Sequence, residues 1–138
     1  FLIQSHIDTI FKHINDIRKI HKSIVKRLKF ALKHWSPMQV IGKVIKPYLK
    51  FEVYKEYIDH HYKAVGTIWD LKKQSGTFRR TLGRCVEQTG YTIGQLLSFV
   101  LSRFLIFNDI MGELYDSTPD GHPDKPFLKS CCEICSKR

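Results

Sequence analysis

Acidic residues are scarce in this chain of 138 residues, which has 13 Asp and Glu against 23 Lys and Arg and a formal net charge of +10. Glycine and proline are also few, at 8 and 5 residues, which excludes collagen-like and low-complexity sequences. With 43% hydrophobic residues, the chain is too apolar for intrinsic disorder. Its length suits one domain with its own core, so we expect a single domain over residues 1–138.

Long, uncharged hydrophobic runs are missing as well. The most apolar segment, residues 96–107, contains Arg103 and is too short to cross a bilayer, so the sequence predicts a buried core helix there. The chain begins on an amphipathic pattern, without the features of a signal peptide. We therefore expect a cytoplasmic protein.

The cysteines are too few for a disulfide scaffold. Of the four, Cys131, Cys132 and Cys135 lie within five residues, and the last two have the C-x-x-C spacing of zinc ligands. A structural zinc site usually needs a second close pair, which this chain lacks. We therefore expect reduced thiols buried on a helix, with no metal and no cofactor, and keep zinc as the less favoured alternative.

The excess of positive charge suggests either nucleic acid or an anionic membrane as a partner. The basic residues are dispersed along the chain, without zinc-finger spacing or an aromatic RNA-binding signature, so we expect no nucleic-acid partner. Basic residues dispersed in this way usually lie on a solvated surface. Attraction to anionic lipids at the inner face of the membrane stays open as an alternative.

Helical periodicity begins in the first segment, where apolar positions recur in alternating steps of four and three. They are Ile3, Ile7, Ile10, Ile14, Ile17, His21, Ile24, Leu28, Ala31 and Trp35. A stripe sustained over more than four heptads predicts a long helix that packs in a bundle. After it, Ser36 and Gln39 fit a capping box that would start the next helix, with a break at Pro47.

Further helices are predicted over residues 53–72, 78–87, about 93–116, and from about 124 onward. Gly76 is positioned to end the first of these, and Thr92 with Gln95 forms a capping box for the third. No strand-like alternation of useful length appears. The sequence therefore predicts an all-α fold, an elongated antiparallel helical bundle.

The middle of the chain has a distinctive order of residues: Trp35, Ile41, Gly42, Phe51, Tyr54, Tyr57, Ala64, Leu71 and Phe78. This order resembles the Dbl-homology domain, the exchange-factor module that acts on Rho-family GTPases. The first segment is also similar to that family, as is the His-Pro-Asp sequence that ends at Asp124. The resemblance covers almost the whole chain.

The resemblance implies a guanine-nucleotide exchange factor for a Rho-family small GTPase. Such a protein stabilises the nucleotide-free GTPase without covalent chemistry, so whether it is an enzyme is left open. The resemblance also suggests an adjacent pleckstrin-homology domain. The alternative is an exchange-deficient Dbl-homology fold that serves as a protein-binding or scaffolding module.

By the same resemblance, the GTPase-binding residues are Ser102, Arg103, Ile106, Phe107 and Asp109. The family typically has Gln at the place of Ser102, Arg or Lys at Ile106, and Leu at Asp109. These departures favour the scaffold alternative, whereas the parent family favours exchange activity. The chain also lacks a counterpart of the family's first conserved helix and of the end of its last helix.

Overall fold

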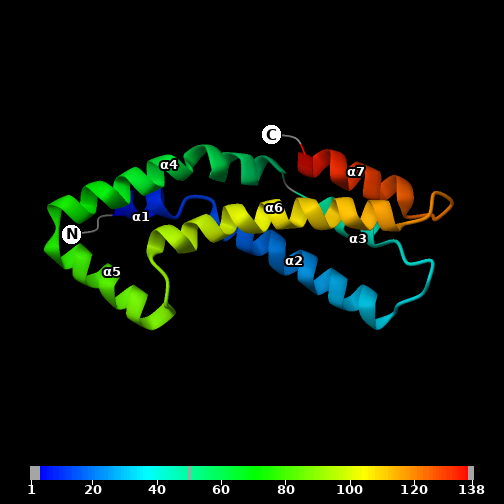
Figure 1. Cartoon of the computed structure of the whole chain (residues 1–138), viewed down its shortest axis with the longest axis horizontal. Helices are drawn as coiled ribbons and strands as arrows, with labels where there is room; N and C mark the ends of the chain where they lie inside the picture. The colour runs from blue at the N-terminus through cyan, green and yellow to red at the C-terminus, as the bar shows by residue number, and fades with distance from the viewer. Residues whose placement is uncertain (1–3, 50, 137–138) are drawn as a thin grey trace.

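The computed structural model describes residues 4–49 and 51–136, which form seven α-helices and one 3-10 helix and contain no β-strand. The elements are α1 (Gln4–Ile10), α2 (Ile14–Lys33), α3 (Ile41–Ile45), η1 (Lys46–Tyr48), α4 (Phe51–Gln74), α5 (Gly76–Thr89), α6 (Ile93–Ser117) and α7 (Lys125–Ser136). They form an elongated bundle in which α4 and α7 run antiparallel to α6 (Figure 1). The predicted all-α architecture is confirmed.

The core consists of three clusters of buried side chains, and α6 contributes to each of them. Leu97, Phe104 and Met111 belong to one cluster apiece and are seven residues apart, so the clusters follow one another along that helix. The predicted apolar stripe near the start of the chain supplies the facing side chains. Its buried members are Ile10, Ile17, Ile24 and Ala31.

The long helix predicted for the first segment is interrupted, and this prediction was wrong. Residues 11–13 form a turn between α1 and α2, in which His13 has a left-handed backbone with φ of 68°. The His13 Nε2 lies 3.3 Å from a carboxylate oxygen of Glu56 in α4. The stripe also ends early, because Trp35 is 58% exposed.

The capping box predicted at Ser36 does not form. Residues 34–40 are not helical, and α3 starts only at Ile41, without a side-chain cap from its N-cap residue Val40. The Gln39 amide instead donates to the carbonyl of Ala31 near the end of α2, at 3.1 Å. The backbone donors at the start of α3 are therefore satisfied by a distant part of the chain.

That distant partner is Asp124, whose side chain is buried just before α7. Its carboxylate accepts hydrogen bonds from the backbone N–H of Gly42 at 2.9 Å and of Lys43 at 3.3 Å. Gly42 must be glycine at this contact, because a Cβ there would lie 2.9 Å from the backbone nitrogen of Leu128. The two segments therefore meet backbone to backbone.

His122, in the loop before α7, stabilises the same contact between Asp124 and the start of α3. Its Nδ1 accepts from the backbone N–H of Asp124 at 3.0 Å, so its Nε2 carries the proton and donates to the carbonyl of Pro37 at 2.7 Å. The histidine and the aspartate of the His-Pro-Asp sequence are thus structural residues that fasten the α2–α3 connection to the start of α7.

The two junctions around α5 follow local capping rules. Ser75 caps α5, because its hydroxyl accepts from the backbone N–H of Phe78 at 3.1 Å. Gly76 therefore begins α5, whereas it was predicted as the end of the preceding helix. The capping box of Thr92 and Gln95 is confirmed, with its two hydrogen bonds at 3.1 and 2.9 Å.

Helix α6 is only partly a core helix, so the prediction for residues 96–107 was partly wrong. Phe99, Leu105 and Ile106 are 43%, 48% and 44% exposed. Among the described residues, α6 alone is long and apolar enough to cross a membrane by length and composition. In this structure it packs against α4, α5 and α7, and core helices meet the same two criteria.

We expect Asp124→Ala to lower the free energy of unfolding by roughly 2–3 kcal/mol, because two backbone donors lose a buried charged acceptor. Urea denaturation followed by circular dichroism measures this change. Asp120→Ala is the matched control, since that side chain is fully exposed and the nearest Lys125 nitrogen is 3.7 Å away. Equal stability of the two variants would show that the cap is not stabilising.

Candidate functional site

The five site residues predicted by resemblance lie in the middle of α6, but they do not all face the same way. Ser102, Ile106 and Asp109 are exposed and follow the four–three spacing of one helical face. Arg103 is exposed next to that face. Phe107 turns inward and packs against the core cluster that contains Met111, so its side chain supports the face from behind.

An uncovered row of large apolar side chains runs along the same side of α6. Phe99, Ile106 and Ile110 are 43%, 44% and 46% exposed. Their spacing of seven and four residues places them on one side of the helix, with Phe99 two turns before Ile106 and Ile110 one turn after it. Ser102 and Arg103 lie between Phe99 and Ile106, so this side of α6 mixes apolar and polar exposed residues, which is typical of a surface that another protein covers.

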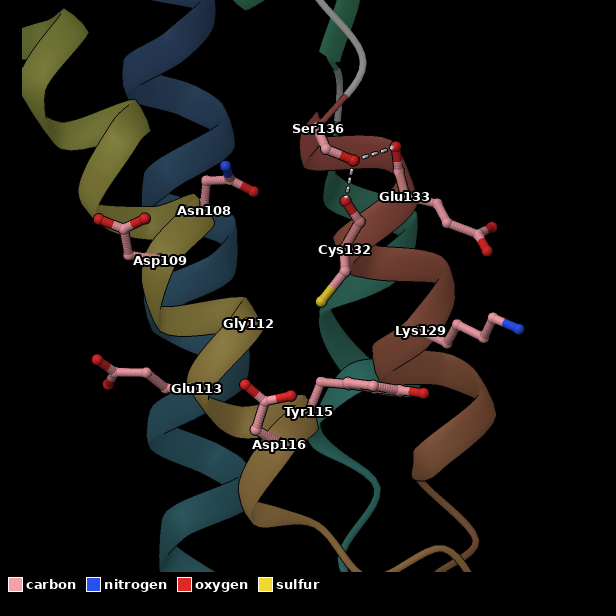
Figure 2. Close-up of a pocket in the computed structure, with 10 residues that line it drawn as sticks. All are labelled: Asn108, Asp109, Gly112, Glu113, Tyr115, Asp116, Lys129, Cys132, Glu133 and Ser136. Atoms are coloured by element: carbon pink, nitrogen blue, oxygen red, sulfur yellow. Dashed lines mark hydrogen bonds between the residues drawn. The ribbon is translucent and has the colours of Figure 1, made fainter.

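An open groove of about 690 Å³ lies beside this face, between α6 and α7 (Figure 2). Its lining includes Asp109, and the side chains of Cys132 and Tyr115 lie between the two helices. Figure 2 shows the carboxylates of Asp109 and Glu113 pointing away from α7. The groove between α6 and α7 therefore lies next to an acidic edge of α6.

The acidic edge stands out in a chain whose net charge is +10. Asp109, Glu113 and Asp116 follow one another in steps of four and three along α6, and Glu133 of α7 also lines the groove. Of these four, only Asp109 is among the site residues predicted from the sequence. The spacing of the three α6 carboxylates is a signal that could have identified the edge, whereas Glu133 belongs to the other wall of the groove and its carboxylate points away from α6 (Figure 2).

The groove has a fixed wall because Lys125 ties the start of α7 to the end of α6. Its Nζ donates to the carbonyls of Tyr115 at 2.6 Å and Thr118 at 2.9 Å. The same nitrogen lies 3.9 Å from the centroid of the Tyr115 ring. A cation is favourable at this position, because the C-terminal end of a helix carries a partial negative charge.

Two of the three cysteines of α7 are core residues. Cys131 and Cys135 are buried and free, and burial raises the pKa of Cys131 to about 12 and of Cys135 to about 11. Thiols with such high pKa values stay protonated and are poor nucleophiles and metal ligands. In the part of the chain that the structure describes, no three His, Cys, Asp or Glu side chains are placed to hold a metal ion.

Behind the exposed face, a hydrogen bond joins His21 of α2 to the hydroxyl of Tyr54 of α4. Burial, together with the positive charge of Arg103, lowers the pKa of His21 below its usual value of 6.5. Burial raises the pKa of Tyr54, so both groups stay neutral. Arg103 therefore interacts electrostatically with the interior of the bundle as well as with solvent.

Comparison with known proteins places this geometry in a family. The chain matches the RhoGEF domain over residues 1–137. It is 29% identical to the mouse phosphatidylinositol 3,4,5-trisphosphate-dependent Rac exchanger 1 protein over 98% of the chain and 9% of that relative. It is 28% identical to mouse Rho guanine nucleotide exchange factor 38 over 86% of the chain and 17% of that relative.

A solved structure has the same fold. The chain superposes on the Vav1 exchange factor, described for the structural role of its PH and C1 domains, with a TM-score of 0.85 and 23% identity. The match covers 98% of this chain and 37% of that one. The chain thus spans only a small part of the curated relatives named above and under half of this solved chain.

We expect Arg103→Gln to raise the pKa of His21, because it removes a nearby positive charge that disfavours the imidazolium. Since the pKa of His21 is lowered in the folded state, its burial costs stability as pH falls below 6.5, and the variant should lose less stability there. Titration of the histidine ring signals by NMR measures the shift. Lys129→Gln is the control, and equal shifts in both variants would contradict the prediction.

Proposed function

Because the chain belongs to the RhoGEF domain family, we propose that it is a guanine-nucleotide exchange factor domain for a Rho-family small GTPase. The chain spans only 9% and 17% of the two relatives compared by sequence. The activity and the partner of the whole protein are therefore part of the proposal. The observation that carries it is the exposed α6 face, where Ser102, Ile106 and Asp109 adjoin an uncovered apolar row.

In this proposal the domain acts by binding, without covalent chemistry. The α6 face, with Ser102, Arg103, Ile106 and Asp109, contacts the switch regions of the GTPase, and Phe107 supports that surface from inside. A surface that binds the nucleotide-free GTPase more tightly than the loaded one must weaken nucleotide binding by linkage. The acidic edge at Asp109 and Glu113 would face basic groups of the GTPase.

We further propose that residues 1–138 are one Dbl-homology domain whose α6 face is completed by the family's first conserved helix. The support is the apolar surface of α6 outside the proposed contact residues, at Phe99 and Ile110, which are 43% and 46% exposed. The family's longer last helix would likewise extend α7.

The alternative is an exchange-deficient Dbl-homology fold that acts as a protein-binding or scaffolding module. It is favoured by the chemistry of the exposed positions, where an acidic Asp109 and an uncharged Ile106 stand in place of the family's apolar and cationic residues. Such a surface can still bind a partner while it lacks the contacts that distinguish the nucleotide-free state. Exchange kinetics therefore separate the two functions.

We also propose a cytoplasmic protein with a pleckstrin-homology domain next to this one and with a membrane-facing side. Vav1, which shares the fold, has PH and C1 domains. The basic side is α2, which has seven Lys and Arg against one Asp. Phe30 and Leu32 of α2 are 64% and 65% exposed among these charges, a combination that suits an anionic lipid surface.

The exchange prediction concerns the three departures on α6. We expect the natural full-length protein to be a weak exchange factor, and Ser102→Gln, Ile106→Lys and Asp109→Leu together to accelerate nucleotide release from at least one Rho-family GTPase. Each restored hydrogen bond to a charged group contributes on the order of 1.5–3 kcal/mol to the nucleotide-free complex. Release of a fluorescent nucleotide across a GTPase panel is the measurement.

Its control replaces three exposed residues of another helix, α4, with Lys55→Gln, Asp59→Asn and Lys63→Gln, and should leave the release rate unchanged. Strong activity of the natural protein would eliminate the scaffold alternative. GTPase binding without faster release, before and after restoration, would support the scaffold and contradict the exchange function.

The membrane prediction concerns α2. We expect binding to vesicles that contain phosphatidylserine to weaken with rising salt, and to weaken further in Lys26→Gln/Lys29→Gln/Lys33→Gln, at about 1 kcal/mol per lysine near the surface. Vesicle sedimentation measures the bound fraction. Lys55→Gln/Lys63→Gln/Lys129→Gln changes the net charge equally elsewhere. Equal loss of binding in both triple variants would refute a specific role for α2.

A further inference from the structure

A second concave surface lies at the opposite end of the bundle from the α6–α7 groove. It is a groove of about 450 Å³ between α4, α5 and the first residues of α6. Figure 1 shows α5 folding back from the end of α4, which leaves the two helices splayed apart. From this end of α6, the N-cap residue Thr92 and the first helical residues Ile93 and Gly94 line the groove, so Ser102 is roughly 12 Å further along the helix.

The groove has an apolar floor and apolar walls. Ile68 of α4 is buried at its base, with Leu82 of α5 and Ile93 packed against the same core cluster. On the α4 side, Val65 and Trp69 are 41% and 59% exposed, and Val86 on the α5 side is 40% exposed. These exposed side chains converge on one cleft, so they are more than scattered surface hydrophobes.

The lining residues have the spacing of two helical ridges. They occupy positions i, i+3, i+4 and i+7 of each helix, which are Val65, Ile68, Trp69 and Lys72 in α4 and Arg79, Leu82, Gly83 and Val86 in α5. Two such ridges with a gap between them match the side-chain row of a third helix. The space beside Gly83 is open, because a Cβ there would meet no atom within 4 Å.

The rim of the groove is positively charged. Lys72 and Arg79 line it, Lys73 lies 5.2 Å from the Trp69 ring centroid, and no acidic side chain is among the described residues that form the lining. Residues 63–90 contain six Lys and Arg against two Asp and Glu. An apolar cleft with a cationic rim selects an occupant with an apolar ridge and acidic flanks.

We propose that this groove is a docking site for an acidic amphipathic helix, separate from the α6 face. The apolar ridge of that helix lies between Trp69 and Val86, and its carboxylates face Lys72 and Arg79. A bilayer surface fits less well, because the apolar side chains line a cleft between two helices and do not project from a convex face.

The test uses the full-length protein and two labelled peptides, each about four helical turns long. Both have leucine at positions i, i+3, i+4 and i+7, with glutamate at the solvent positions of one and lysine in the other. Fluorescence anisotropy should show the glutamate peptide binding at least about tenfold more tightly at low salt. Equal affinities, or no binding of either peptide, would overturn the proposal.

Matched glycine variants locate the site. Gly83→Leu fills the groove and should weaken the glutamate peptide by about tenfold or more, which corresponds to about 1.4 kcal/mol. Gly66→Leu makes the same change outside the groove, where a Cβ also meets no atom within 4 Å, and should leave the affinity unchanged. Both replacements favour the helical state, so loss of the fold is not the expected cause.

Charge variants complete the test. Lys72→Glu should weaken the glutamate peptide and improve the lysine peptide, whereas Lys63→Glu, which lies on α4 outside the groove, should do neither. The same effect from both glycine variants would overturn the assignment to the groove. Loss of binding to phosphatidylserine vesicles in Gly83→Leu, without peptide binding by the natural protein, would identify a membrane surface and refute the helix site.

Discussion

The buried carboxylate of Asp124 joins parts of the chain that are 82 residues apart, and the position of α3 against the start of α7 depends on that contact. Helix α3 has only five residues, too few to be stable by itself. Its first backbone donors are satisfied by Asp124, and Gly42 lets α7 approach without a side chain between them. Because α7 forms one wall of the groove beside α6, this contact also sets the geometry next to the candidate site.

The sequence predicted those features that depend on neighbouring residues. The helical span of 93–116 and the capping box at Thr92 were correct, because hydrophobic spacing and a three-residue cap are local. The capping box at Ser36 was wrong, since α3 takes its cap from Asp124 and Gln39 bonds to α2. The turn at His13 was also missed, because the apolar stripe continues in register through it.

The same limit applies to the candidate site. That Ser102, Ile106 and Asp109 share a face follows from helical spacing, but whether that face is inside or outside the bundle does not. Helix α6 is apolar on several sides, so periodicity alone does not separate exposed Ile106 from inward-facing Phe107. The place of Glu133 in the wall of the same groove requires the packing of α7, which no short sequence window contains.

The exposure of Ser102, Ile106 and Asp109 has an evolutionary consequence. Substitutions at solvent-facing helix positions usually change folding stability little, whereas the seven-residue repeat of Leu97, Phe104 and Met111 is held by the core. The proposed GTPase-binding surface can therefore change without loss of the fold. A chain can lose its family's most recognisable motif in this way and still keep the family's architecture.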